Sequence, residues 1–174
     1  MRGHPQSAGA VPVRWLPDPT VTDIMITEQE IQELVAAATA VRTLAYVPYS
    51  GYAVGAALRT DNGHIFTGCN VENASYGLTV CAERNAVFQA VACGERAIQA
   101  VAVVTENGVT PCGACRQVLA EFNPQMTVIV VDMIGGRRTY TLPELLPDAF
   151  GPEHLQGAGA VSVQSAGAVS VQKP

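Results

Sequence analysis

Two short segments of this sequence hold side chains with the types and spacing of a hydrolytic metal site. Cys81 and Glu83 are separated by one residue, and Cys112 and Cys115 form a Cys-x-x-Cys pair further along the chain. Three thiolates suit a zinc ion, and three protein ligands keep the fourth position free for water, as hydrolytic zinc requires. Glu83 would take a proton from that water and return it to the leaving group. The pattern therefore predicts a zinc-dependent hydrolase.

Both cysteine segments are expected to lie at the start of a helix. Helical spacing of apolar residues predicts helices over about 81–93 and 112–122. The positive end of a helix dipole favours the thiolate form of a cysteine placed there. Regular helix geometry separates Cys81 from Glu83, so Glu83 approaches the metal-bound water only if Cys81 lies in the cap turn.

Two arginines follow the cysteine segments and are candidates to stabilise the sulfurs. Three thiolates on Zn²⁺ leave a net negative charge, which opposes acidification of the bound water. An N–H group of Arg84 or Arg116 that bonds to a sulfur would offset this charge. Arg84 is the stronger candidate because it lies on the predicted helix that follows Cys81. The alternative for both residues is an arginine that only faces solvent.

The remaining cysteines and the histidines are not assigned to the metal. Cys69 and Cys93 are expected to be small buried apolar side chains. The histidines fall in a tail, a hairpin turn and a C-terminal segment, and none is expected to be a ligand: His4, His64 and His154. Two readings from other classes stay open, namely a non-catalytic zinc-binding interaction module and a thiol-disulfide protein that uses the Cys-x-x-Cys pair.

Composition narrows the function further. The chain has 174 residues, of which 48% are hydrophobic and 14% are charged, as in a single domain with a well-filled core. A net charge of −5 gives a phosphate backbone nothing to bind, so we expect no nucleic-acid partner. An odd number of cysteines favours a reducing compartment. With no long apolar run and no signal-peptide core, we expect a cytoplasmic protein without membrane contact.

The other elements place the cysteine segments in an α/β domain. A capping box at 27–30 predicts a helix over about 27–44, and Asp61-Asn62-Gly63 predicts a hairpin turn. Strands alternate with helices through the middle of the chain, which predicts β-α-β units and a three-layer α/β/α sandwich with a mixed five-stranded sheet. The expected strands are 53–60, 64–71, 97–105, 126–132 and 137–141.

The two ends of the chain differ in composition from its middle. Residues 1–26 are rich in proline and are expected to form a flexible arm. Residues 156–174 contain two copies of Ala-Gly-Ala-Val-Ser-Val-Gln and are expected to be a low-complexity tail. The catalytic domain is therefore expected to span residues 27–155.

Six segments carry a resemblance to a known family. They are Tyr-Val-Pro-Tyr-Ser at 46–50, Val-Gly-Ala-Ala-Leu at 54–58, Gly-Cys-Asn-Val-Glu-Asn at 68–73, Cys-Ala-Glu-Arg at 81–84, Pro-Cys-Gly-Ala-Cys-Arg-Gln at 111–117 and Leu-Leu-Pro-Asp-Ala-Phe-Gly-Pro at 145–152. With them, the sequence over about residues 29–155 resembles the cytidine deaminase family, in its short-chain form with three cysteine ligands. The resemblance implies zinc-dependent hydrolysis of cytidine and deoxycytidine to uridine and deoxyuridine, with release of ammonia, as in pyrimidine salvage.

The same resemblance implies the remaining site residues and the assembly. Asn70 and Glu72 would hold the ribose 3′-hydroxyl, and their spacing on an extended segment agrees with this role. Tyr52 stands where the family usually has Phe against the base. Arg84 would contact the ligand sulfurs, and Ala82 would contact the substrate. The family forms homotetramers, in which Phe150 and Tyr76 of the partner subunit would close each pocket.

Two related activities compete with this assignment. Deaminases of modified cytosine nucleosides such as blasticidin S keep the cysteine motifs but lack the intact Asn-x-Glu-Asn run, which this chain has at 70–73. A polynucleotide deaminase needs a basic groove and stacking aromatics, and the pI of about 5.1 argues against it. Ordinary cytidine and deoxycytidine are therefore the favoured substrates. The alternative for Asn70 and Glu72 is a structural role in loop hydrogen bonds.

Overall fold

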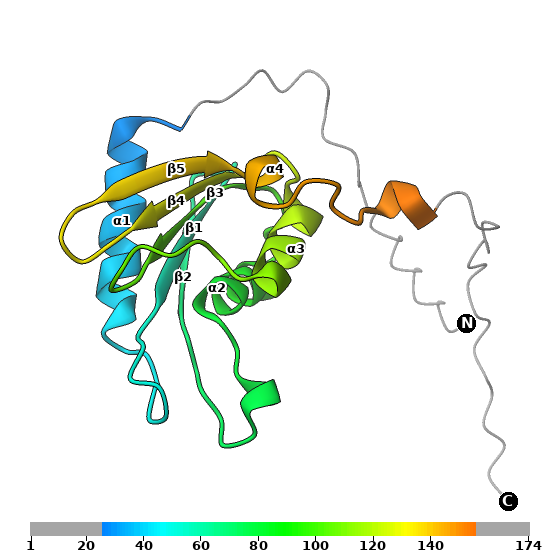
Figure 1. The fold of residues 1–174 in the computed structure, drawn as a ribbon. Helices are drawn as coiled ribbons and strands as arrows, with labels where there is room; N and C mark the ends of the chain where they lie inside the picture. The colour runs from blue at the N-terminus through cyan, green and yellow to red at the C-terminus, as the bar shows by residue number, and fades with distance from the viewer. Residues whose placement is uncertain (1–25, 156–174) are drawn as a thin grey trace, which may run out of the picture.

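A mixed five-stranded sheet lies at the centre of the part of the chain that the computed structural model describes, residues 26–155 (Figure 1). The strand order is β2-β1-β3-β4-β5. Only β3 and β4 pair in parallel, and the other neighbours are antiparallel. The strands are β1 (Gly55–Thr60), β2 (Ile65–Cys69), β3 (Ile98–Val104), β4 (Thr127–Val131) and β5 (Arg137–Thr141).

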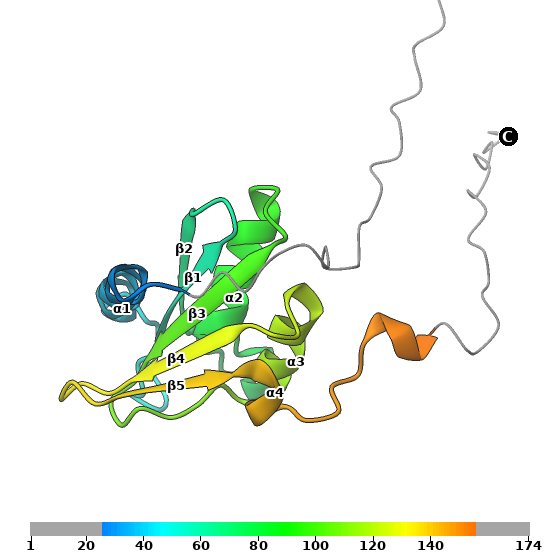
Figure 2. The same cartoon turned by 90° about the horizontal axis from the view of Figure 1, so that it is seen from above.

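Helices cover both faces of this sheet. Helix α1 (Glu28–Arg42) lies on one face, while α2 (Ala82–Ala92) and α3 (Gly113–Phe122) lie on the other (Figure 2). Two separate apolar clusters of buried residues fill the space between the layers, one beneath α1 and one beneath α2 and α3. The predicted three-layer α/β/α sandwich is confirmed.

The local sequence signals for a helix start and a hairpin turn correspond to elements in the structure. Thr27 is the N-cap of α1, and its capping box with Glu30 is complete. The turn between β1 and β2 contains Gly63 at φ +80, a conformation that glycine adopts without strain. Short helices follow, namely η1 (Tyr76–Leu78), α4 (Leu142–Leu145) and η2 (Pro152–Leu155). The predicted arm and tail lie outside the described residues, apart from Ile26.

Backbone contact at one glycine fixes the position of α2 on the sheet. Gly68 lies in β2 directly against the first turns of α2. A side chain at this position would collide with the carbonyl oxygen of Ala82 and the amide nitrogen of Ala86. The Asn85 amide adds a hydrogen bond of 2.9 Å to the carbonyl oxygen of Cys69. The start of α2 is therefore held tightly against the end of β2.

One prediction about the core is wrong. Cys93 is the C-cap of α2 and is exposed, and Cys69 is only half-buried with its sulfur near the carbonyl oxygen of Leu44. Neither is a buried core residue. In the described residues no helix is both long and apolar enough to cross a membrane.

Candidate active site

Three cysteine sulfurs converge where α2 and α3 begin. The Sγ atoms of Cys81, Cys112 and Cys115 all lie within 4.8 Å of one another, and those of Cys81 and Cys112 are 3.9 Å apart. Two thiolates on a tetrahedral zinc ion, with Zn–S bonds of about 2.3 Å, lie roughly 3.8 Å apart. The cluster therefore fits one zinc ion per chain.

The helix caps explain why the sulfurs are free to converge. Cys81 and Cys112 are the N-caps of α2 and α3, with extended backbone, and neither side chain makes a capping hydrogen bond to the backbone of its own helix. Cys115 lies in the first turn of α3 and is fully buried. Both helices direct their positive ends at the cluster, which stabilises negative charge on sulfur. Cys81 occupies the cap turn that an approach by Glu83 requires.

The sulfurs also change one another's acidity. A hydrogen bond from the Cys115 thiol, together with the nearby Arg84 guanidinium, lowers the pKa of Cys81 to about 5. The same hydrogen bond and burial raise the pKa of Cys115. The cluster thus favours the thiolate form of Cys81, beside the Arg84 guanidinium.

Arg84 faces the ligand sulfur on its own helix. One terminal nitrogen of Arg84 lies 3.3 Å from the Cys81 sulfur and 3.3 Å from the carbonyl oxygen of Thr79. Its Nε is buried and has no hydrogen-bond partner. The guanidinium therefore directs positive charge at the cluster and is held there by the backbone before α2.

Arg116 does not contact sulfur. It donates to the carbonyl oxygens of Pro111 at 2.7 Å and Leu145 at 2.6 Å, and to the Thr110 hydroxyl at 2.8 Å. These bonds fasten the turn before Cys112 to α4. Of the two arginines predicted as sulfur donors, Arg84 takes that position, and Arg116 instead holds the loop that presents a ligand.

Glu83 is a buried carboxyl beside the sulfurs. It is only 4% exposed, and burial raises its pKa, with the negative charge of Cys81 acting in the same direction. A raised pKa favours the protonated form of this carboxyl, so Glu83 is suited to accept a proton, as a general acid and base must.

The polar residues predicted to hold a ribose lie on a loop system next to the cluster. Both side-chain atoms of Asn70 bond to backbone, with Oδ1 accepting from Val54 N at 2.8 Å and Nδ2 donating to Tyr52 O at 2.9 Å. The Glu72 carboxylate accepts from the backbone N–H groups of Tyr49 and Ser50 and from the Ser50 hydroxyl. Asn70 and Glu72 thus organise the 46–54 segment.

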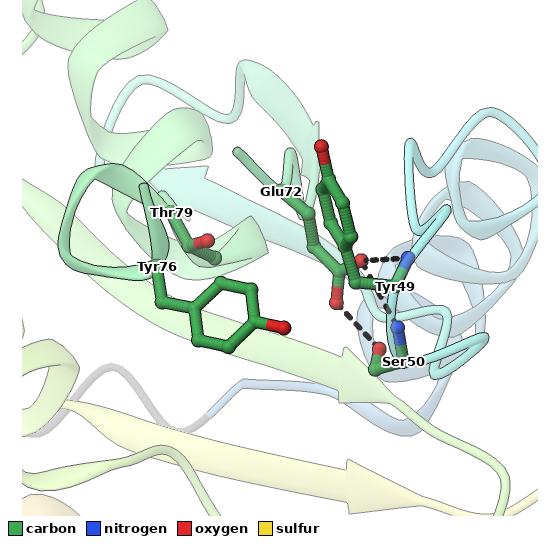
Figure 3. Close-up of a pocket in the computed structure, with 5 residues that line it drawn as sticks. All are labelled: Tyr49, Ser50, Glu72, Tyr76 and Thr79. Atoms are coloured by element: carbon green, nitrogen blue, oxygen red, sulfur yellow. Dashed lines mark hydrogen bonds between the residues drawn. The ribbon is translucent and has the colours of Figure 1, made fainter. Parts of the chain in front are cut away.

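A pocket of about 260 Å³ opens beside Glu72. Figure 3 shows Tyr76 and Thr79 on one side of it, and Glu72, Tyr49 and Ser50 on the other. The Tyr49 and Tyr76 rings meet edge to face, with centroids 5.9 Å apart. Thr79 lies two residues before Cys81, so the pocket adjoins the segment that leads to the metal ligands.

Comparison with known proteins decides the family. A family model described as the zinc-binding region of cytidine and deoxycytidylate deaminases matches residues 28–131, which include all three cysteines and Glu83. The chain belongs to the cytidine and deoxycytidylate deaminase family.

Relatives and solved structures of this family cover most of the deaminase chain. A cytidine deaminase of Sporosarcina psychrophila is 48% identical over 132 residues, which is 74% of this chain and 97% of the relative. One of Halalkalibacterium halodurans is 49% identical over 127 residues, covering 71% and 96%. The crystal structure of a Burkholderia pseudomallei cytidine deaminase is 50% identical, with a TM-score of 0.68, and covers 72% of this chain and all of that one.

Three further residues predicted for the deaminase site differ in their exposure to solvent. Ala82 is fully buried at the first position of α2. Tyr76 and Phe150 are 73% and 59% exposed. The carbonyl oxygen of Phe150 accepts from Gln117, and its ring stacks on His154. Both aromatic rings are thus available to another molecule.

Sequence reasoning did not foresee two structural contributors to the deaminase site. Ser50 bridges the Tyr52 amide and the Glu72 carboxylate, and Arg116 fastens the Cys112 turn. The position of Arg116 directly after Cys115 is a signal that the sequence offers. The sequence does not indicate which groups Arg116 bonds to. Ser50 stands between aromatic residues in the sequence, and no spacing pattern connects it to Glu72.

Proposed function

We propose that this chain hydrolyses cytidine and deoxycytidine to uridine and deoxyuridine, with release of ammonia, and so serves pyrimidine salvage. The observation that carries the proposal is the convergence of three cysteine sulfurs with the buried carboxyl of Glu83. Relatives named cytidine deaminase support the substrate class.

The chain's own residues divide the work. Cys81, Cys112 and Cys115 hold the zinc ion, which supplies an acidified water as the nucleophile. Glu83 would accept one proton of that water and pass it to the base nitrogen, and would then pass the second proton, from the hydroxyl added to the ring carbon, to the departing amine. Arg84 withdraws negative charge from Cys81 through its N–H group.

The nucleoside is proposed to bind beside the ligand helix. Asn70 and Glu72 hold the ribose 3′-hydroxyl, and the pocket that Glu72 lines supports this placement. Tyr52 packs its ring against the base. Ala82, next to the ligand Cys81, contributes the wall of the site at the start of α2.

The active unit is proposed to be a cytoplasmic homotetramer of catalytic domains that span residues 27–155. Phe150 and Tyr76 of the partner subunit complete each site. Exposure of these rings in the single chain supports this arrangement, because burying large aromatic rings at a subunit interface removes them from water and is favourable.

Ultraviolet monitoring of cytidine with purified protein tests the function directly. We expect loss of cytidine absorbance, about one zinc per chain, and loss of turnover after the metal is chelated. Faster release of ammonia from blasticidin S than from cytidine would favour the modified-nucleoside alternative. Bound zinc without turnover of any cytosine nucleoside would favour the non-catalytic interaction module.

A further inference from the structure

One hydrogen bond joins the two loops that border the proposed site. The Tyr52 hydroxyl donates to Oδ1 of Asn107 at 2.6 Å, across 55 positions of sequence. Tyr52 lies in the segment between α1 and β1. Asn107 lies in the loop that leads from β3 to the ligand Cys112.

Tyr52 is connected through its backbone to both proposed ribose residues. Its carbonyl oxygen accepts from the Asn70 amide at 2.9 Å. Its N–H donates at 3.0 Å to the Ser50 hydroxyl, which in turn bonds to Glu72. Every polar group of Tyr52 is thus engaged. Only the hydroxyl reaches across to the loop between β3 and α3, which leads to Cys112 and is called here the metal-bearing loop.

Asn107 is a firm anchor because the turn around it is itself held in place. The Val109 N–H donates to the Thr105 hydroxyl at 3.1 Å, and Thr105 is only 1% exposed. A guanidinium nitrogen of Arg138, on β5, donates to the carbonyl oxygen of Gly108. Gly108 has φ +65, which a residue with a side chain adopts only with strain. The turn therefore presents Asn107 in one position.

We propose that Asn107 is a positioning residue for the nucleoside: by holding the Tyr52 hydroxyl it fixes the Tyr52 ring and keeps the ribose-binding segment docked on the metal-bearing loop. The inference rests on the proposed function.

Phenylalanine at position 52 offers the same ring but no donor, so the hydroxyl is the part of this side chain that the pairing uses. Because the bond acts before chemistry begins, it contributes equally to binding of substrate and transition state, and its loss raises KM while kcat stays constant.

Four variants of the full chain test this pairing with cytidine as the substrate. We expect Tyr52→Phe and Asn107→Ala each to raise KM by about threefold to tenfold, the effect of one net hydrogen bond, with kcat within about twofold of the unaltered chain. The double variant should match the single variants, since both remove the same bond. Asn107→Asp keeps an acceptor oxygen and should restore KM.

Asn62→Ala is the matched control. Asn62 also makes a side-chain hydrogen bond, 3.0 Å to Glu95, but it lies in the β1–β2 turn, at the opposite end of β2 from Asn70. The control should leave KM unchanged even where its melting temperature falls, which separates positioning from general stability.

Three outcomes would overturn the inference: unchanged KM in both single variants, a double variant whose effect is the product of the two single effects, or an equal KM rise in Asn62→Ala. No turnover by the unaltered chain would reject the proposed function and the inference with it. Normal turnover by the unaltered chain with unaffected variants rejects the inference alone.

Discussion

Arg84 places a guanidinium nitrogen 3.3 Å from the sulfur of Cys81, one turn back along the same helix. The separation of three residues between N-cap and first turn makes this contact possible, because side chains at this spacing share a helix face. A sulfur that receives an N–H group gives less charge to the metal. We therefore propose that Arg84 adjusts the charge on the sulfurs without binding the ion.

Replacing Arg84 tests this adjustment. Arg84→Gln keeps an N–H donor but removes the positive charge, and we expect activity to fall by about 10-fold to 100-fold, the usual effect of losing a residue that supports a ligand. Metal content measures zinc binding and cytidine turnover measures catalysis, so the two effects of the substitution are separated. Arg96→Gln, at an exposed arginine beyond the end of α2, is the control and should retain full activity. Full activity in Arg84→Gln as well would contradict the assigned role.

Glu83→Gln separates metal binding from proton transfer. The three sulfurs are untouched, so about one zinc per chain should remain, while turnover should fall by about 10²-fold to 10⁴-fold, the range for general acid and base residues. The melting temperature should not fall, because burial disfavours the charged carboxylate that the substitution removes. Retained turnover in a zinc-loaded variant would reject Glu83 as the proton carrier.

Arg116→Ala should weaken metal binding without touching a ligand. Three hydrogen bonds that fix the turn before Cys112 would be lost, so the sulfur would be less well placed. We expect zinc affinity to fall about 10-fold to 100-fold in competition with a chelator. The control is Arg137→Ala, which breaks the exposed ion pair with Glu28 and should leave zinc affinity unchanged. Equal affinities in the two variants would exclude the positioning role.

Gly68→Ala should destabilise the fold through the start of α2. Its methyl group would collide with Ala82 and Ala86 backbone, which costs about 1–3 kcal/mol as overpacking. Urea unfolding measures this loss. Gly77→Ala is the control, since a methyl group there meets no atom within 4 Å and the backbone needs no positive φ. If both variants unfold at the same urea concentration, the close contact is not what holds α2.

Acid should weaken the cap of α1. Hydrogen bonds from the Thr27 N–H and hydroxyl hold the pKa of Glu30 below its ordinary value of 4.5, and Arg59 contributes as well. A lowered pKa means that folding favours the carboxylate. The contribution is therefore complete above about pH 4.5 and is lost as the pH falls through the folded-state value. Urea midpoints of Glu30→Gln should vary less between about pH 5 and 3 than those of the unaltered chain; parallel curves would contradict this.

The sequence predicts the metal cluster and the layers well, for a physical reason. Cysteine spacing and helix starts are local, and apolar periodicity reports which face of each element is buried. The Thr27 capping box and the Asn62-Gly63 turn are also local signals, and both form as expected. Elements built from contacts between near neighbours are therefore readable before the fold is known.

Contacts between distant segments could not be predicted in this way. The bond from Tyr52 to Asn107, and that from Ser50 to Glu72, join loops with no periodic pattern. Cys93 was expected in the core because cysteine is usually buried, but α2 ends there and Gly94, at φ +88, turns the chain away. Side-chain partners across loops depend on the final arrangement of the backbone.

Placing the ligands at the starts of two different helices has a mechanical consequence. Cys81 begins α2, which follows β2, whereas Cys112 begins α3, which follows β3. An ion shared by these caps cross-links the sheet's antiparallel hairpin to its parallel unit at a point where no disulfide exists among the described cysteines. The zinc ion that supplies the nucleophile would thereby also hold α2 and α3 together. Loss of the metal is therefore expected to lower both turnover and resistance to unfolding.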